Sequence, residues 1–281
     1  MGERAVSTDG VEVAVHDLGG DGPPLLLAHA AGLCGGVFGP LASRLGGRFR
    51  CWALDFRGHG DSITPEEVDF AWSGLADDAL AGLDHLGLEG AYGVGHSSGG
   101  AALLDAEARR PGTFSALWCF EAIVWPEPPP LAPRMALIEG ALRRRETFPS
   151  RSDAYAHFAA KPPLAALDPD ALRAYVECGF ADDDAGDGSV RLKCRREAEA
   201  AVYRQGLTHD GFARLGDVTC DAVVAVGANS PAIGLDVARA QAAALPRGRL
   251  EVFDGLGHFG PLEDPDAVAG AVLRAFGAGA V

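Results

Sequence analysis

Short apolar runs alternate with segments of helical periodicity along most of this chain. Residues 25–28 and 222–226 are wholly apolar, a pattern typical of strands that are buried on both faces of a parallel sheet. The leucines and alanines of residues 75–86 recur at nearly helical spacing. Strands that alternate with helices predict an α/β fold with a mostly parallel sheet. The other predicted strands are residues 11–15, 49–54, 91–94, 116–120 and 249–253.

This alternation stops after residue 125. A proline-rich linker opens the next segment, and helix-like pieces then follow up to about residue 212 without a convincing buried strand. The pattern predicts a helical insertion between two parts of the α/β unit. Within the insertion, three consecutive arginines at positions 143–145 favour one solvated helix face, because surface charge runs are usual; a clamp for a carboxylate is the alternative.

The most informative stretch is Gly-His-Ser-Ser-Gly at residues 95–99. It lies between a predicted strand and an alanine-rich predicted helix, so Ser97 is expected in a strained backbone conformation at the apex of a sharp turn. Gly95 and Gly99 allow the strand and the helix to approach closely. Alternatively, the serine only caps the helix. A dinucleotide-binding loop is excluded, because Ser98 occupies the position of its third glycine.

This turn resembles the nucleophile elbow of the α/β-hydrolases. The stretches at residues 29–32 (His-Ala-Ala-Gly) and 55–62 (Asp-Phe-Arg-Gly-His-Gly-Asp-Ser) are also similar to that superfamily. The resemblance implies an α/β-hydrolase fold: a mostly parallel eight-stranded sheet, flanked by helices, with a helical cap inserted after strand 6. The expected division is a core formed by residues 1–125 and 213–281, and a cap formed by residues 126–212.

The same resemblance implies roles for individual residues. Ser97 is the expected nucleophile, and His258, on the loop after the last strand, is the expected base. The backbone N–H groups of Ser98 and Ala31 are the expected oxyanion hole. Asp55 and Arg57 are expected to tie down their own turn, which leaves His59 a structural role. His96 neighbours the nucleophile, but the sharp turn is expected to point its side chain elsewhere.

The acid of the triad departs from the commonest pattern of the family. Ser230 occupies the position after the seventh strand where most relatives have an aspartate. Glu121 follows the sixth strand instead, and residues 120–126 resemble one haloalkane dehalogenase subgroup in which this glutamate is the acid. Glu121 is therefore the predicted acid and Asp236 the fallback; a salt bridge that anchors the cap is the alternative role of Glu121. Dehalogenation itself is excluded, because Ser97 replaces the aspartate nucleophile which that reaction requires.

These residues predict a serine hydrolase that cleaves a carboxylic ester, thioester or lactone of a small, largely apolar substrate through an acyl-enzyme. A cofactor-free lyase, a perhydrolase and a non-catalytic receptor for a small ligand are the alternatives. No cofactor and no metal are expected.

Charge and cysteine content add expectations about partners and location. The formal net charge of −15 argues against nucleic acid and anionic membranes as partners, which leaves a small-molecule substrate. Six cysteines without a C-x-x-C pair favour reduced thiols. No apolar leader or membrane span is recognisable. A cytoplasmic protein is expected, and the sequence does not indicate its oligomeric state.

Overall fold

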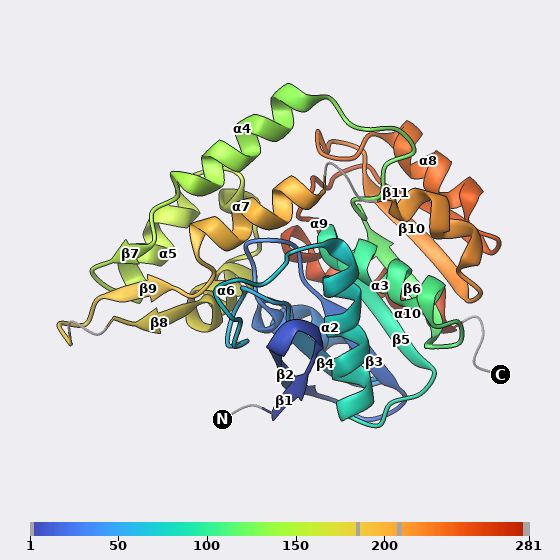
Figure 1. Cartoon of the computed structure of the whole chain (residues 1–281), viewed down its shortest axis with the longest axis horizontal. Helices are drawn as coiled ribbons and strands as arrows, with labels where there is room; N and C mark the ends of the chain where they lie inside the picture. The colour runs from blue at the N-terminus through green and yellow to red at the C-terminus, as the bar shows by residue number, and fades with distance from the viewer. Residues whose placement is uncertain (1–2, 184–185, 207–209, 278–281) are drawn as a thin grey trace.

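The computed structural model describes residues 3–183, 186–206 and 210–277. Within them, an eight-stranded sheet has the order β1-β2-β4-β3-β5-β6-β10-β11 (Figure 1). β2 is antiparallel to both of its neighbours, and the strands from β4 to β11 are parallel. The strands are β1 (Glu3–Val6), β2 (Glu12–Gly19), β3 (Pro24–Ala28), β4 (Arg50–Asp55), β5 (Ala91–His96), β6 (Phe114–Phe120), β10 (Asp221–Gly227) and β11 (Gly248–Phe253).

Helices cover both faces of this sheet. Leu25 and Leu27 of β3 share one core cluster with α1 and α10, whereas Leu26 shares a second cluster with α2, α3 and α8. Because both faces of the strand are buried, every position of β3 can be apolar. The α/β-hydrolase fold predicted from the sequence is confirmed. These helices are α1 (Gly39–Leu45), α2 (Trp72–His85), α3 (Ser98–Arg109), α8 (Leu235–Ala244) and α10 (Pro265–Gly277); the short α9 (Gly260–Glu263) precedes α10.

The segment after β6 contains strands that the sequence did not reveal. β7 (Thr147–Phe148), β8 (Phe180–Asp182) and β9 (Val190–Leu192) pair as an antiparallel sheet of order β7-β9-β8. The expectation that this segment lacks strands is wrong, because two or three residues are too few to display an alternating pattern. The predicted helices are present as α4 (Leu131–Leu142), α5 (Arg151–Ala159), α6 (Pro169–Gly179) and α7 (Arg196–Gln205). The boundaries of the cap stay a prediction.

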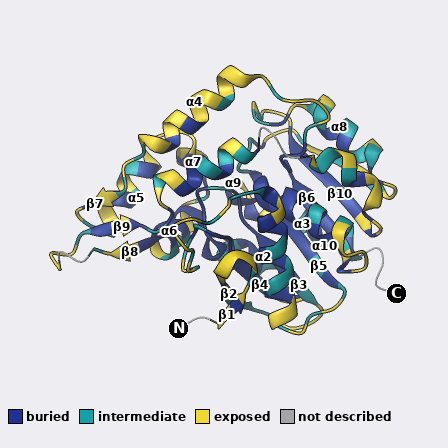
Figure 2. Cartoon of the chain, viewed as in Figure 1, coloured by how far each residue is buried: buried dark blue, intermediate teal, exposed yellow. Residues whose placement is uncertain are grey.

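Helix α4 is the most loosely packed of these helices. It lies alongside α7 above the core (Figure 1), and exposed residues dominate its surface (Figure 2). Of its twelve residues only Ile138 and Ala141 are buried. Hydrophobic burial therefore stabilises α4 much less than the sheet helices.

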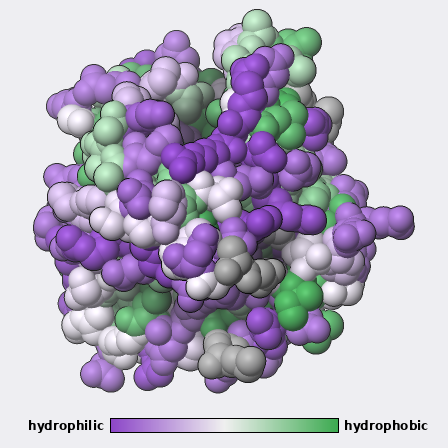
Figure 3. All heavy atoms as spheres, turned by 90° about the vertical axis from the view of Figure 1, so that its left-hand side faces the viewer, coloured by the Kyte–Doolittle hydropathy of each residue, from purple (hydrophilic) through white to green (hydrophobic). Residues whose placement is uncertain are grey.

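The face that carries β7, β8 and β9 is covered mostly by hydrophilic side chains, and apolar residues are scattered over it in small groups (Figure 3). Among the helices that the structure describes, none combines the length and the apolar character that a membrane span requires. The six cysteines are free thiols.

Candidate active site

Ser97 occupies a strained turn between β5 and α3. Its backbone angles are φ 57° and ψ −117°, outside the regions that a residue with a side chain normally adopts. A Cβ atom at Gly95 would lie 2.5 Å from Gly100 Cα, and one at Gly99 would lie 2.2 Å from the Ala28 carbonyl oxygen. Only glycine therefore fits at these two positions, as the sequence predicted.

Glu121 and His258 meet although 137 positions separate them in the sequence. His258 Nδ1 donates a hydrogen bond of 2.6 Å to Glu121 Oε2. Since Nδ1 is engaged, Nε2 is the ring nitrogen that can accept a proton. Glu121 is fully buried and, like Ser97, has a positive φ, of 48°. The end of β6 thus stores backbone strain where it presents the carboxylate to the histidine.

Two further donors hold the Glu121 carboxylate. The Gly227 N–H donates to Oε1 at 3.0 Å, and the Ser230 hydroxyl donates to Oε2 at 2.6 Å. Ser230, at the position where the family resemblance led us to expect an aspartate, therefore holds the carboxylate of Glu121, the predicted acid. Among the ion pairs of the described residues, the partner of Glu121 is His258, and no salt bridge joins it to the segment after β6.

The fallback acid, Asp236, does not reach this site. Its side chain is 96% exposed at the start of α8, where it pairs with Arg239. An exposed carboxylate that is engaged elsewhere cannot orient His258.

Two buried histidines hold the turn that contains Ala31. His29 Nδ1 donates to the Ala30 carbonyl at 2.8 Å, and its Nε2 accepts the Phe56 N–H. His59 Nε2 accepts the Gly32 N–H at 3.0 Å. Burial lowers the pKa of both rings, and it lowers that of His59 to about 3. Both rings are therefore neutral at pH 7, and His59 lies beneath the turn in the structural role expected of it.

The Ala31 N–H is free to bind a ligand. No hydrogen-bond acceptor among the described residues takes it. Ser98 begins α3, so its N–H has no partner within the helix. Ala31, Ser97 and Ser98 line one cavity. The serine and two residues with unpaired backbone N–H groups thus border the same space.

His96 does not line the cavity that contains Ser97, but its side chain has a contact that the sequence did not reveal. Its ring lies against that of His258, with 5.1 Å between centroids, and its Nε2 donates to the His258 carbonyl at 2.7 Å. The side chain therefore supports the loop that carries His258. Burial lowers the pKa of His96 well below its usual value, so the ring is neutral and adds no charge beside His258.

The cavity that contains Ser97 and His258 has a volume of about 420 Å³. Its walls are mostly apolar, with contributions from α4, α7 and the loop before α8. A second cavity of about 330 Å³ shares Ala31, Leu137, Pro163, Tyr203 and Phe259 with the first. The two cavities adjoin at the turn that contains Ala31.

The three arginines after α4 do not share one solvated face, so that expectation is wrong. Arg143 is 72% exposed, whereas the Arg144 side chain is only 19% exposed and pairs with Glu199 at 2.9 Å. Arg145 stacks on Phe148, 4.4 Å from the ring centroid. The reason is that α4 ends at Leu142, so helical spacing no longer sets the direction of these side chains. Arg144 lines the second cavity.

One group of possible metal ligands occurs in the part of the chain that the structure describes. Ligand atoms of His16, Asp55 and Asp61 lie within 4.8 Å of one another. His16 Nε2 is hydrogen-bonded to Asp55 Oδ2 at 2.8 Å, and Asp61 pairs with Lys193. Because these atoms already bind one another and Lys193, the donors do not form an open metal site.

Comparisons with known proteins identify the family of the chain. A family model described as "Alpha/beta hydrolase family" matches residues 25–271. The 2-(acetamidomethylene)succinate hydrolase of Mesorhizobium japonicum is 29% identical over 75% of this chain and 72% of that protein. The pimeloyl-[acyl-carrier protein] methyl ester esterase of Xanthomonas campestris is 36% identical, but the match spans only 34% of this chain and 35% of that protein.

A solved structure extends the likeness over the whole chain. The crystal structure of an E-2-(acetamidomethylene)succinate hydrolase matches with a TM-score of 0.86 and 25% identity, and covers 99% of both chains. This likeness covers the sheet, the helices and the segment after β6. The family model covers most of the same residues. The chain belongs to the alpha/beta hydrolase family and is an esterase-like hydrolase.

Proposed function

We propose that the chain is a serine hydrolase that cleaves a carboxylic ester, thioester or lactone through an acyl-enzyme on Ser97. The observation that carries this proposal is the 2.6 Å hydrogen bond between His258 Nδ1 and Glu121 Oε2, in a histidine that borders the same cavity as Ser97. A serine hydroxyl is a weak nucleophile until an oriented base accepts its proton.

In the proposed first half-reaction, His258 Nε2 takes the proton of the Ser97 hydroxyl as its oxygen attacks the acyl carbonyl. The N–H groups of Ser98 and Ala31 donate to the developing oxyanion; one such donor typically lowers the barrier by about 3 kcal/mol. Glu121 stabilises the imidazolium that forms. The protonated His258 then gives its proton to the leaving alcohol or thiol.

In the second half-reaction, water replaces the leaving group. His258 Nε2 accepts a proton from this water as it attacks the acyl carbon, and the same two N–H groups hold the second oxyanion. The tetrahedral intermediate expels the Ser97 oxygen, which recovers its proton from His258. The products are a carboxylic acid and the free enzyme.

The proposal is tested by covalent labelling together with substrate turnover. A fluorophosphonate should label wild-type enzyme on the peptide that contains Ser97, and Ser97→Ala should remain unlabelled. In a screen of p-nitrophenyl esters of increasing chain length and of lactones, Ser97→Ala should lower kcat at least about 10⁴-fold. Labelling at another serine, or hydrolysis by Ser97→Ala within tenfold of wild type, would contradict the proposal.

Hydrolysis of an amide is a second candidate. It is favoured by the name of the relative with the TM-score of 0.86, which specifies an acetamido compound. The same triad serves both bonds, except that His258 must then protonate an amine. Matched ester and anilide substrates with the same acyl group separate the two: amide hydrolysis predicts turnover of both, and ester hydrolysis predicts turnover of the ester alone.

A further inference from the structure

Arg134 is an unusual side chain in the cavity that contains Ser97. It lies in the first turn of α4 and is half-buried. Among the described residues that line this cavity, it is the one arginine, and neither lysine, aspartate nor glutamate accompanies it. His258 is the other titratable base there. The field inside an otherwise apolar cavity is therefore set largely by the Arg134 guanidinium.

No carboxylate of the described residues lies within ion-pair distance of Arg134. Its guanidinium stacks on the indole of Trp125, 4.4 Å from the ring centroid. Stacking uses the face of the guanidinium and leaves its N–H edge available for hydrogen bonds. Burial lowers the pKa of Arg134. The reason is that a partly desolvated cation without a counter-ion is unfavourable.

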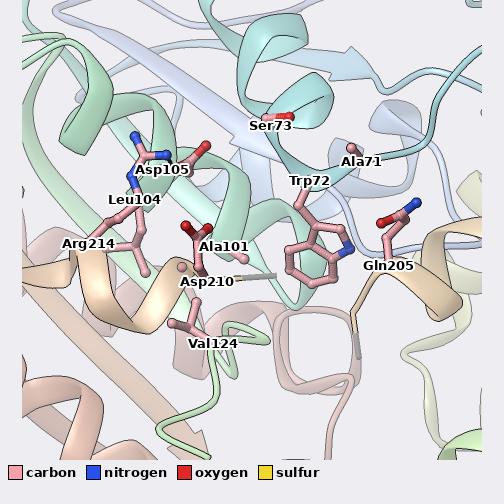
Figure 4. Close-up of a pocket in the computed structure, with 11 residues that line it drawn as sticks. Ala71, Trp72, Ser73, Ala101, Leu104, Asp105, Val124, Gln205, Asp210 and Arg214 are labelled. Atoms are coloured by element: carbon pink, nitrogen blue, oxygen red, sulfur yellow. Dashed lines mark ion pairs between the residues drawn. The ribbon is translucent and has the colours of Figure 1, made fainter. Parts of the chain in front are cut away.

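The arginines that border the two cavities nearest to this one in character each have an acidic partner, although Arg4 and Arg249, which border other hollows, form no ion pair among the described residues. In the cavity of Figure 4, Arg214 pairs with Asp105 at 3.1 Å. In the cavity beside the active site, Arg144 pairs with Glu199 at 2.9 Å. The sequence contains 39 acidic residues against 24 basic ones, so protein carboxylates outnumber the cations. Arg134 differs from Arg144 and Arg214 in that it borders its cavity without such a partner.

We propose that Arg134 binds a carboxylate group of the substrate, so that the enzyme acts on anionic acyl compounds whose remaining part is apolar. This inference rests on the proposed function of Ser97 and His258, which border the same cavity. A guanidinium can donate two parallel hydrogen bonds to a carboxylate, and an anion at Arg134 would supply the counter-ion that the protein does not. The alternative is a structural role, in which Arg134 only fixes α4 on Trp125.

Kinetics on matched esters separate the two roles. The anionic substrates are the monomethyl esters of succinate, glutarate and adipate. Their neutral counterparts are methyl levulinate and its two longer homologues, in which a methyl ketone replaces the carboxylate at the same chain length. We expect wild-type enzyme to prefer the anionic ester at least about tenfold in kcat/KM for one or more lengths, mainly through KM. Proton release in a weakly buffered solution measures both series.

Arg134→Gln should abolish this preference and leave the neutral esters nearly unchanged. Arg143→Gln is the matched control, because Arg143 follows the same helix, is 72% exposed and pairs with Glu139; it should keep the preference. A structural role predicts that Arg134→Gln lowers kcat/KM equally for anionic and neutral esters. That result, or a wild-type enzyme without preference for any anionic ester, would overturn the inference.

Binding without turnover distinguishes failure of this inference from failure of the proposed function. Titration calorimetry of Ser97→Ala with succinate, glutarate and adipate requires no catalysis. At least one dicarboxylate should bind about tenfold more tightly to Ser97→Ala than to the double variant Ser97→Ala/Arg134→Gln, whereas the dimethyl esters should not discriminate. Equal affinity of both proteins, or absence of binding by both, counts against Arg134 as the anion site, whatever bond the enzyme cleaves.

Discussion

In the part of the chain that the structure describes, two histidine–carboxylate pairs have a buried acid and nearly the same geometry, whereas the pair of His85 and Glu3 is exposed. His16 Nε2 and Asp55 Oδ2 are 2.8 Å apart, and His258 Nδ1 and Glu121 Oε2 are 2.6 Å apart. The histidines are 24% and 20% exposed and the acids 2% and 0%, so burial does not separate the pairs. Their surroundings do. His258 borders a cavity with Ser97, whereas Asp55 also accepts the N–H groups of Gly35 and Asp61.

The difference shows that a histidine–acid pair is not by itself a catalytic device. In the pair of His16, the remaining hydrogen bonds of the acid close a turn of the backbone. In the pair of His258, the strained Ser97 and the residues Ala31 and Ser98 border the same cavity as the histidine. The first pair is therefore expected to contribute to stability and the second to rate.

Glu121→Gln should have the largest effect. The amide can donate to Nδ1 and so favour the wrong tautomer of His258, which should lower kcat by about 10³- to 10⁴-fold with little loss of stability. The kcat on a p-nitrophenyl ester that wild type hydrolyses measures this effect. Asp236→Asn is the control and should leave kcat unchanged. An Asp236→Asn variant that is more damaged than Glu121→Gln would show that the acid is wrongly assigned.

Asp55→Asn should act on stability instead. Burial alone would raise the pKa of Asp55, but the hydrogen bond and charge of His16 outweigh burial and lower it to about 2. Removal of this charge leaves the partners of a buried ion pair uncompensated, which should lower the free energy of unfolding by about 3 kcal/mol. Urea denaturation measures the loss. If Asp55→Asn unfolded like wild type but lost its kcat, the pair of His16 and Asp55 would contribute to catalysis and not to stability.

Low pH should destabilise the turn that contains Ala31, through His59. The pKa of His59 is about 3 in the folded protein and near 6.5 in an unfolded chain, so only the unfolded state takes up a proton between these values. Stability should therefore fall as the pH falls, by about 2 kcal/mol between pH 6.5 and pH 5 from this residue. His59→Gln keeps an acceptor for the Gly32 N–H. Its free energy of unfolding, measured at several pH values, should decline less steeply towards acid pH than that of wild type. An unchanged slope would show that protonation of His59 is not the cause of the decline.

Ser230→Ala should have the smallest effect of the four. It removes one donor to Glu121 Oε2 but leaves the Gly227 N–H and His258. Loss of one hydrogen bond is worth about 1 kcal/mol, or about fivefold in kcat. Steady-state kinetics at pH 7 measure it, with Ser115→Ala as an exposed serine control. A loss of kcat as large as that of Glu121→Gln would show that the Ser230 hydroxyl is essential for holding the Glu121 carboxylate in place.

The parts of the molecule that local geometry dictates were predictable. Gly95 revealed the close contact of β5 and α3, and the apolar runs revealed the buried strands, whereas the close neighbour of Gly99 is the end of β3, which the local pattern did not indicate. The contact of Glu121 with His258 was predictable from a carboxylate after β6 and from Ser230 at the usual place of the acid. The catalytic roles of these residues stay predictions. The strands β7, β8 and β9 were not predictable, because each is too short for a periodic signal.

Side-chain environments in the segment after β6 were equally hidden. Arg143 and Arg144 are neighbours of identical type, yet one is exposed and the other is paired with Glu199. His96 was recognised only as a neighbour of Ser97, since its contact with His258 crosses 162 positions. Nothing in a local pattern distinguishes an arginine that has a partner from one that has none.

The sequence by itself determined which chemistry is available: a serine in a glycine-flanked turn, a histidine after the last strand, a carboxylate after the sixth, and strands apolar enough to be buried on both faces. Each depends on residues close together in the chain, where backbone geometry acts directly. The tertiary structure decided which of two similar histidine–acid pairs borders a cavity with Ser97, and which arginine lacks a counter-ion there. These properties depend on burial and charge contributed by distant segments, and they exist only once the chain has folded.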